Sequence, residues 1–370
     1  MPPNIIFVLL DGSRWDRLDI SKDFQILRNE GILFNNISAA YPYTFAAINA
    51  MFTGKFGKEN GVDAYYKMFR LKNSINFLPE ILKNNGYFTA CDLISDKVIS
   101  SRGFDIHQSH DEYVDDLLER HPNFLEKIFL SAKKKPVFAF LQFSKIHTVT
   151  VTEVLKKYDW DNQEFYKNSK NNLKNYDESF LQSTKYAKKI YDTVKKLGKL
   201  KATVIIFFCD HGTGVGERFG ERNYGVFLFE ETIRTYHLFI GSNMQKNILT
   251  DKLFSSIQLF PTILDIAEIN SSNYCSVRSL EPYLINSKDI DSEEITFSET
   301  GGLQGPFPSP KTPNVFCIKN SQFKLIYYKT PQKYELFDLL NDPKELKNLF
   351  GKGLTIEQKL IEKLSRWINR

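Results

Sequence analysis

The sequence predicts an α/β fold in which a mostly parallel central sheet carries helices on both faces, with a small α+β subdomain after it. Runs of β-forming residues alternate with helical patterns through the first 270 residues, an order typical of parallel sheets. After about residue 291 the pattern changes to short strands separated by Gly and Pro and ends in an amphipathic helix. We therefore expect a large domain over 1–290 and a C-terminal subdomain over 291–370.

Continuous apolar runs predict the strands of the large domain, because a strand that is covered on both faces needs no polar side. These runs span 4–10, 87–91, 137–143, 203–208 and 236–240. Apolar residues at helical spacing predict helices near 46–53, 76–85, 180–198 and 254–268. In the subdomain, short strands at 294–298, 315–318 and 323–328 precede a helix that is expected to begin with a Thr355–Gln358 capping box.

Composition excludes several classes of protein. The chain is 42% hydrophobic and 25% charged, which is typical of a soluble globular protein, and it has no run of about 18 apolar residues that would form a membrane-spanning helix. Residues 1–4 lead directly into the first strand and leave no room for a secretory signal, so we expect a cytoplasmic location. The four cysteines are scattered without a CxxC pair and are expected to be reduced thiols.

The net charge of +5 comes from one segment. Residues 156–201 carry twelve Lys against six Asp or Glu, an excess that accounts for all of it. Ala187, Ile190 and Val194 recur at helical spacing through this segment, so most of the Lys side chains are expected on the solvated face of a helix. The alternative is a lysine-rich rim that attracts a polyanionic substrate. No binding of nucleic acid is expected.

Two predicted strands end on residues that bind metals. Asp11 follows the run 4–10, and Asp210 and His211 follow the run 203–208. Ligands of parallel sheets bind beyond the carboxyl ends of the strands, so we expect these side chains at one edge. A carboxylate and imidazole set there would hold a divalent ion. Each residue also has a plainer interpretation, as a helix-capping Asp or a surface turn residue.

A third segment offers a nucleophile. Thr44 follows a Pro-containing stretch and precedes helix-favouring residues, so we expect it at a helix N-cap. Its oxygen would there meet the positive end of the helix dipole and a metal ion, and both would stabilise an alkoxide. On its own, a Thr before a helix is usually only a cap.

These segments together resemble the sulfatase-like branch of the alkaline phosphatase superfamily along nearly the whole chain. The resemblance lies in the order and spacing of Pro3–Asp16, Tyr43–Gly54, Leu78–Tyr87, Phe138–His147, Asp210–Glu217, Phe229–Arg234, Leu259–Ala267 and Tyr334–Leu349. It implies that Thr44 is the nucleophile and that one divalent ion is held by Asp11, Thr44, Asp210 and His211. It also implies that His147 and Arg218 contact the substrate or its leaving group.

Departures from the family pattern bear on the chemistry. A sulfatase proper converts a Cys or Ser in a Cys/Ser-x-Pro-x-Arg motif to formylglycine, whereas this chain has Thr44-Phe-Ala-Ala-Ile48, which cannot form that aldehyde. The resemblance is therefore closer to the members that use Thr and move phosphoryl or phosphodiester groups. Gly12, next to Asp11, also removes one ligand of the calcium site typical of formylglycine sulfatases.

We therefore expect a metal-dependent hydrolase or transferase that acts on a phosphate ester or phosphodiester through a covalent phospho-threonine at Thr44. The alternatives are a sulfuric ester hydrolase and a non-catalytic binding relative. The expected ion is Mn²⁺, Mg²⁺ or Zn²⁺ rather than Ca²⁺, and the expected partner is a small-molecule, glycan-linked or lipid-linked anionic ester. The roles of Lys145, Arg218 and Tyr224 stay open. The remaining histidines lie outside any matched motif and are interpreted as structural; they are His107, His110, His121 and His237.

Overall fold

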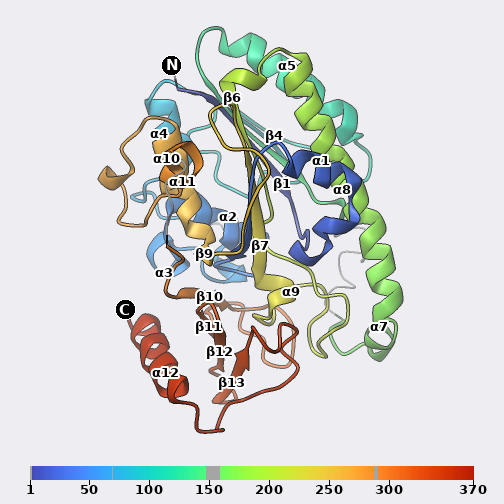
Figure 1. The fold of residues 1–370 in the computed structure, drawn as a ribbon, viewed down its shortest axis with the longest axis vertical. Coiled ribbons are helices and arrows are strands. Elements are labelled where there is room, and N and C mark those ends of the chain that lie inside the picture. The colour runs from blue at the N-terminus through green and yellow to red at the C-terminus, as the bar shows by residue number, and fades with distance from the viewer. Residues whose placement is uncertain (1, 69, 147–158, 287–290) are drawn as a thin grey trace.

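The computed structural model describes residues 2–68, 70–146, 159–286 and 291–370 (Figure 1). Its centre is a nine-stranded sheet in the order β4-β3-β5-β1-β6-β7-β2-β8, with β9 paired to β2. The strands are β1 Asn4–Leu10, β2 Ile32–Ser38, β3 Phe88–Leu93, β4 Ile106–Ser109, β5 Val137–Phe143, β6 Thr203–Phe208, β7 Arg234–Ile240, β8 Ile248–Thr250 and β9 Phe254–Ser255. The predicted fold class is confirmed.

The sheet is parallel from β4 to β6 and mixed beyond. β1 lies between β5 and β6 and is parallel to both, whereas β7 is antiparallel to its neighbours β6 and β2. The three central strands lie where their apolar runs predicted them. β2 was not predicted, because Asn35 and Asn36 interrupt its pattern at the point where the register shifts against β7. β4 is a four-residue strand and too short to recognise from its sequence.

Helices cover both faces of the sheet, as predicted (Figure 1). They are α1 Lys22–Arg28, α2 Thr44–Thr53, α3 Gly57–Asn60, α4 Leu78–Asn84, α5 Leu117–Ala132, α7 Gln163–Lys167, α8 Ser169–Lys196, α9 Glu230–Ile233, α10 Leu259–Ile266 and α11 Glu281–Asn286. Phe7 packs with α2, α4 and α10 on one face, and its neighbour Val8 packs with α5 and α8 on the other. Successive residues of a strand point to opposite faces, so β1 is covered by the core on both sides.

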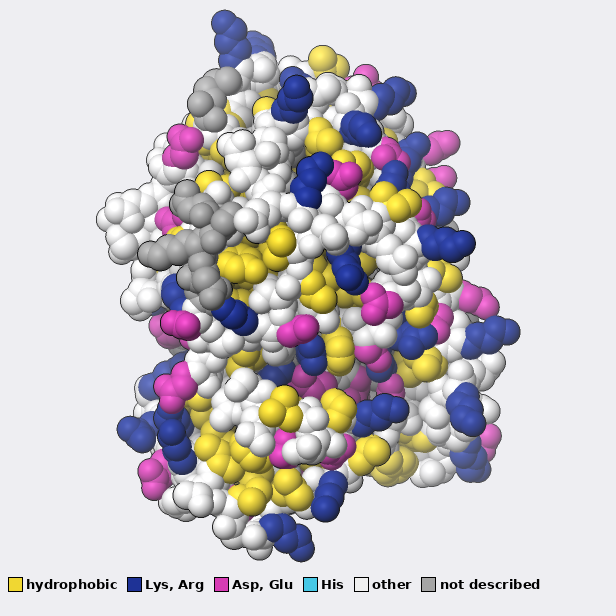
Figure 2. All heavy atoms as spheres, in the orientation of Figure 1, with side chains coloured by type: hydrophobic (Ala, Val, Ile, Leu, Met, Phe, Trp, Pro, Cys, Tyr) yellow, Lys and Arg dark blue, Asp and Glu magenta, His cyan; other side chains and the backbone are white. Residues whose placement is uncertain are grey.

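The Lys-rich segment forms much of α8, and its charges face solvent. Ala187, Ile190 and Val194 are fully buried, while Lys185 and Lys189 are exposed. Lys and Arg are interspersed with Asp and Glu over the face drawn in Figure 2, which agrees with a solvated helix surface. Within the described ranges, no helix combines the length and apolarity needed to cross a membrane. All four cysteines are free.

The C-terminal part is a four-stranded antiparallel sheet with a terminal helix, at the lower end of Figure 1. Its elements are β10 Thr296–Thr300, β11 Val315–Lys319, β12 Phe323–Tyr328, β13 Lys333–Asp338 and α12 Thr355–Ile368. The expected capping box is wrong: Leu354 is the N-cap residue of α12 without a side-chain cap, and Gln358 donates to Glu362 instead. The helix is held by its apolar face, through residues such as Leu360 and Leu364.

A buried charge network joins this sheet to the large domain. Glu230, at the start of α9, lies 2.8 Å from the Nζ atoms of both Lys319 and Lys324, and Lys324 also lies 2.7 Å from Glu345. All four side chains are buried. The two lysines lower the pKa of Glu230, against the effect of burial, well below its usual range. The segment that leads into α9 is thereby attached to β11 and β12.

Replacing Glu230 by Gln should leave Lys319 buried without a carboxylate, and Lys324 with Glu345 alone. Breaking a buried pair on one side is strongly destabilising, so we expect the free energy of unfolding to fall by about 3 kcal/mol in urea denaturation at neutral pH. Glu294→Gln is the matched control, since Glu294 pairs with Lys363 in solvent, and it should change little. Equal stability of the two variants would contradict this assignment.

Glu221 makes the stability of the folded state depend on pH. Burial raises its pKa to about 8, although the backbone N–H groups of Phe227 and Val226 oppose this. An unfolded Glu has a pKa of about 4.3, so the folded protein holds this proton more tightly and loses stability as the pH rises from about 5 to 8. We expect Glu221→Gln to lose less stability than wild type over that range in thermal unfolding; parallel curves would contradict it.

Candidate active site

Asp11, Asp210 and His211 meet at one edge of the sheet. Leu9 of β1 is the register partner of Phe208 of β6, so the residues that follow the two strands emerge side by side. All three side chains are buried, and their ligand atoms lie within 4.8 Å of one another. The predicted convergence of the metal-binding residues is thus present in the structure.

Thr44 adds a hydroxyl to this cluster. Its Oγ1 lies 3.3 Å from each carboxylate oxygen of Asp11 and 3.2 Å from Nε2 of His211. The expected N-cap position is wrong by one residue: Tyr43 is the N-cap of α2, and Thr44 is the first helical residue. Because Thr44 makes no capping hydrogen bond, its oxygen is directed at the cluster, close to the positive end of the helix.

The hydrogen bonds of His211 orient its ring. Nδ1 lies 2.8 Å from the carbonyl oxygen of Gly212, which places the proton on Nδ1. Nε2 then presents a lone pair to the site, 3.2 Å from Thr44 Oγ1 and 3.5 Å from Asp210 Oδ2. The ring of Tyr224 lies 4.5 Å from the His211 ring. An imidazole oriented in this way is a typical metal ligand.

The cluster brings two buried acidic groups together, so its negative charge is unbalanced whenever both are ionised. Both carboxylate oxygens of Asp210 are buried and have no hydrogen-bond partner among the described residues. Burial, and then the charge of Asp11, raise the pKa of Asp210 well above its usual range. The single hydroxyl proton of Thr44 can satisfy only one of the acceptors around it. A divalent cation among Asp11, Asp210 and His211 would remove this imbalance, and the donor set fits one.

Gln142 positions Asp11 and was not predicted. It lies in β5, donates from Nε2 to Asp11 Oδ2 at 2.7 Å, and accepts from the backbone N–H of Ile94 at 3.2 Å. The side chain is fully buried. The sequence carried one signal for it, a single polar residue within an otherwise apolar buried strand.

Arg14 supports the loop that follows His211. It forms an ion pair with Asp16 at 2.8 Å, donates to the carbonyl oxygen of Thr213 at 3.1 Å, and pairs with Glu217. Thr213 in turn donates to the carbonyl oxygen of Gly12. Gly12 has a φ of 72°, a value that favours glycine, where the chain turns away from β1. The loops after β1 and β6 are therefore held together.

The structure does not bring Arg218 into the cluster. Its Nε donates to Glu231 at 2.8 Å, and its guanidinium lies 4.1 Å from the ring of Phe229. Its Nη1 and Nη2 donate to the carbonyl oxygens of Glu345 and Lys344, in the segment after β13. These contacts attach the loop to the C-terminal part. The substrate contact expected of Arg218 remains a prediction. His147 lies outside the described residues, so its expected role also stays a prediction.

Comparisons with known proteins agree with this geometry. The family model described as Sulfatase matches residues 3–269, and a model described as N-sulphoglucosamine sulphohydrolase, C-terminal, matches residues 221–370. Arylsulfatase K of Bos taurus is 28% identical over 184 residues, which cover 48% of this chain and 33% of that protein. The chain spans about a third of the length of the curated relatives it matches.

Solved structures resemble the whole chain. A 2-O GAG sulfatase matches with a TM-score of 0.80 at 18% identity, covering 100% of this chain and 92% of its own. Phosphonate monoester hydrolase of Agrobacterium radiobacter matches with a TM-score of 0.75 at 16% identity, covering 98% and 95%. At these identities the likeness shows the fold alone.

Asp210→Asn should have opposite effects with and without metal. In chelator, the variant should melt at the same temperature as wild type or higher, because it removes a buried carboxylate that lacks a partner. With excess divalent ion, wild type should melt several degrees higher than the variant, because only wild type gains full binding energy. The control is Asp265→Asn in α10, a carboxylate that accepts hydrogen bonds from Ser271. The same order of melting temperatures in both conditions would contradict metal binding at Asp210.

Proposed function

The chain belongs to the sulfatase family, and we propose that it is a metal-dependent hydrolase of sulfuric esters, carried on a sugar or an aryl alcohol, with Thr44 as the attacking group. The observation that carries the proposal is the position of Thr44 Oγ1, 3.2–3.3 Å from both Asp11 and His211 at the edge of the sheet. The names of its relatives, arylsulfatase K and a GAG sulfatase, support the substrate class.

Asp11, Asp210 and His211 would hold one divalent ion. When bound, the ion supplies a Lewis acid for the ester and lowers the pKa of a nearby hydroxyl. Two carboxylates and an imidazole fit Mn²⁺ or Zn²⁺ better than Ca²⁺ or Mg²⁺, which take oxygen ligands almost alone. This choice rests on the ligands within the described part of the chain.

The residues of the chain divide the reaction into two steps. Thr44 Oγ1 attacks the sulfur atom, and its proton passes to a carboxylate oxygen of Asp11, 3.3 Å away. The bond from sulfur to the leaving alcohol breaks, and the alcohol takes up a proton, for which His147 is the predicted donor. Water then attacks the sulfur atom and the bond to Thr44 Oγ1 breaks. That oxygen takes back the proton held by Asp11, one proton of the water returns to the donor of the first step, and the sulfur leaves as hydrogen sulfate.

Charge balance favours a singly charged substrate. Two carboxylates and one divalent ion sum to zero, so the site offers little attraction to a second negative charge. A sulfate monoester carries one charge, whereas a phosphate monoester, with a second pKa of about 6, is mostly a dianion at neutral pH. The site therefore fits a sulfate monoester, or another monoanion, better than a phosphate monoester.

A second candidate function is cleavage of a phosphodiester through a phospho-threonine, by hydrolysis or by transfer to an acceptor alcohol. The specific observation that favours it is Thr44 itself, which cannot become formylglycine. A phosphodiester is a monoanion and passes the same charge argument. Among the structural neighbours, the Agrobacterium radiobacter enzyme is named as a phosphonate monoester hydrolase.

Turnover of aryl sulfate, bis-aryl phosphate and aryl phosphate by the metal-loaded protein tests the proposal. We expect aryl sulfate to be cleaved, and Thr44→Ala to lower that turnover by roughly 10³-fold or more, because it removes the atom that attacks. Thr53→Ala is the control, since Thr53 lies in the same helix and bonds only to carbonyl oxygens of its neighbours and to Asn60.

Three results distinguish the candidates. Loss of aryl sulfate cleavage in Thr44→Ala alone supports the proposal. Cleavage of the bis-aryl phosphate without that of the sulfate moves the assignment to the second candidate. Sulfate cleavage that survives Thr44→Ala overturns the role of Thr44.

A further inference from the structure

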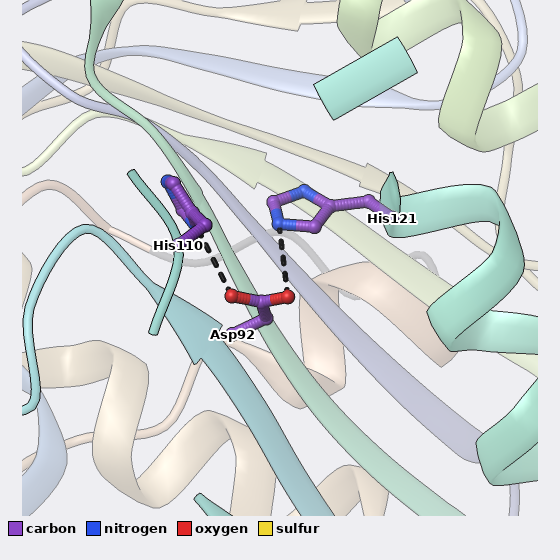
Figure 3. A group of neighbouring side chains, drawn as sticks. All are labelled: Asp92, His110 and His121. Carbon is purple, nitrogen blue, oxygen red and sulfur yellow. Dashed lines mark hydrogen bonds and ion pairs between the residues drawn. The ribbon is translucent and has the colours of Figure 1, made fainter. Parts of the chain in front are cut away.

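A second cluster of metal-ligand side chains lies on another part of the sheet. Asp92 is in β3, His110 follows β4, and His121 is in α5, so three separate segments bring them together (Figure 3). They are buried, with exposed fractions of 0%, 4% and 0%. One ligand atom from each lies within 4.8 Å of the other two. Nothing in the proposed reaction uses this cluster.

The two imidazoles face the two oxygens of the same carboxylate (Figure 3). Nδ1 of His110 lies 3.0 Å from Oδ1 of Asp92, and Nε2 of His121 lies 3.8 Å from Oδ2. The second distance is too long for a hydrogen bond. It is close to the separation of two atoms that share an ion, since a zinc ion holds each ligand at about 2.0–2.2 Å. The gap at His121 is the place where an ion would fit.

His121 is oriented toward this gap without a hydrogen-bond partner of its own there. Its Nδ1 lies 2.5 Å from the hydroxyl of Tyr186 in α8, while its Nε2 is buried and has no hydrogen-bond partner among the described residues. Burial lowers the pKa of His121 to about 3, so the ring is neutral. A neutral imidazole whose far nitrogen is held by another side chain is how proteins present a histidine to a metal.

Asp92 supplies the negative charge. Although burial opposes it, hydrogen bonds from His110 and Arg120 lower the pKa of Asp92 to about 2, so the carboxylate is ionised. Gln108 and Arg120 both donate to Oδ2 at 2.8 Å. Hydrogen-bonded carboxylates are common among metal ligands. The Arg120 side chain is 31% exposed, so one partner of Asp92 reaches the surface.

We propose that Asp92, His110 and His121 form a second binding site for a divalent transition-metal ion, with Zn²⁺ as the best fit. Two imidazoles and one carboxylate match the ligands that Zn²⁺ takes, whereas Ca²⁺ and Mg²⁺ take oxygen ligands almost alone. Three protein ligands leave the fourth position of a tetrahedral ion for water. The proposal does not depend on the reaction that the other site performs.

The ion would fasten the edge of the sheet. β4 is a four-residue edge strand, held on one side by β3, and the ligands attach both the segment after it and the start of α5 to β3. Two residues beyond His110, Glu112 accepts from the backbone N–H of Ser144 at the end of β5. Binding of an ion to the folded state alone stabilises that state, so the effect is expected in the melting temperature.

The chain supplies its own control in His237. This histidine of β7 is also buried, burial lowers its pKa to about 3, and neither ring nitrogen has a hydrogen-bond partner among the described residues. It belongs to neither of the two metal-ligand groups found in the described part of the chain. His237 shares the burial of His121 but is not part of a metal-ligand group among the residues that the structure describes. A difference in zinc content between His121 and His237 variants therefore reports on the cluster and not on burial.

The experiment measures zinc in the full chain after chelation, reloading with Zn²⁺ and dialysis. We expect His110→Gln and His121→Gln each to hold about one Zn²⁺ per chain less than wild type, and His237→Gln to hold as much as wild type. Zn²⁺ should raise the melting temperature of His237→Gln more than that of His121→Gln. Equal zinc content in His121→Gln and wild type would overturn the proposal.

A second measurement tests metal binding at this cluster if the histidine variants do not fold. Asp210→Asn weakens the site formed by Asp11, Asp210 and His211, so the ion that remains is the one at Asp92. Addition of Co²⁺ to this variant should give the visible absorption of a four-coordinate ion with nitrogen ligands. Absence of that absorption at saturating Co²⁺ would overturn the proposal, whatever the activity of the wild type.

Discussion

The repulsion between two buried carboxylates is the constraint on which this structure depends. Asp11 and Asp210 are brought together because β1 and β6 are parallel neighbours in register, and a parallel pair must deliver its carboxyl ends to the same edge. This placement costs free energy, because both carboxyl groups are buried away from water. The surrounding contacts hold the two carboxylates together: Gln142 fixes Asp11, and the carbonyl of Gly212 sets the tautomer of His211. The proposed cation among Asp11, Asp210 and His211 would offset this repulsion.

The large domain could be predicted from its sequence because its signals are local and strong. The apolar runs of β1, β5 and β6 are buried on both faces, so each run could be read directly. β2 could not, since Asn35 and Asn36 break its pattern and its pairing is decided by β7. The start of α2 was predicted one residue too late for a similar reason. Tyr43 rather than Thr44 is the N-cap, and its dihedral angles depend on packing around its ring, whose centroid lies 4.6 Å from that of Tyr65.

The convergence of the candidate site residues could be predicted from the sequence, whereas the side chains that support them could not. Asp11, Thr44, Asp210 and His211 each follow a strand or begin a helix, and their chemical types are informative alone. Gln142 acts across two strands, and only the sheet order shows that it faces Asp11. His110 and His121 lie 18 and 29 residues from Asp92, without a motif to join them. Their proximity arises from the β3–β4 pairing and the packing of α5.

The contacts of Arg218 and Glu230 make the C-terminal sheet part of the machinery that holds the active-site loop. Arg218 lies in the loop after His211 and Glu230 lies where that loop enters α9. Both residues bind side chains or backbone in the last third of the chain. An insertion or truncation beyond β10 would therefore disturb the positions of Asp11 and Asp210, although these residues are far away in the sequence. Exchange of the C-terminal part between relatives would need the matching loop to travel with it.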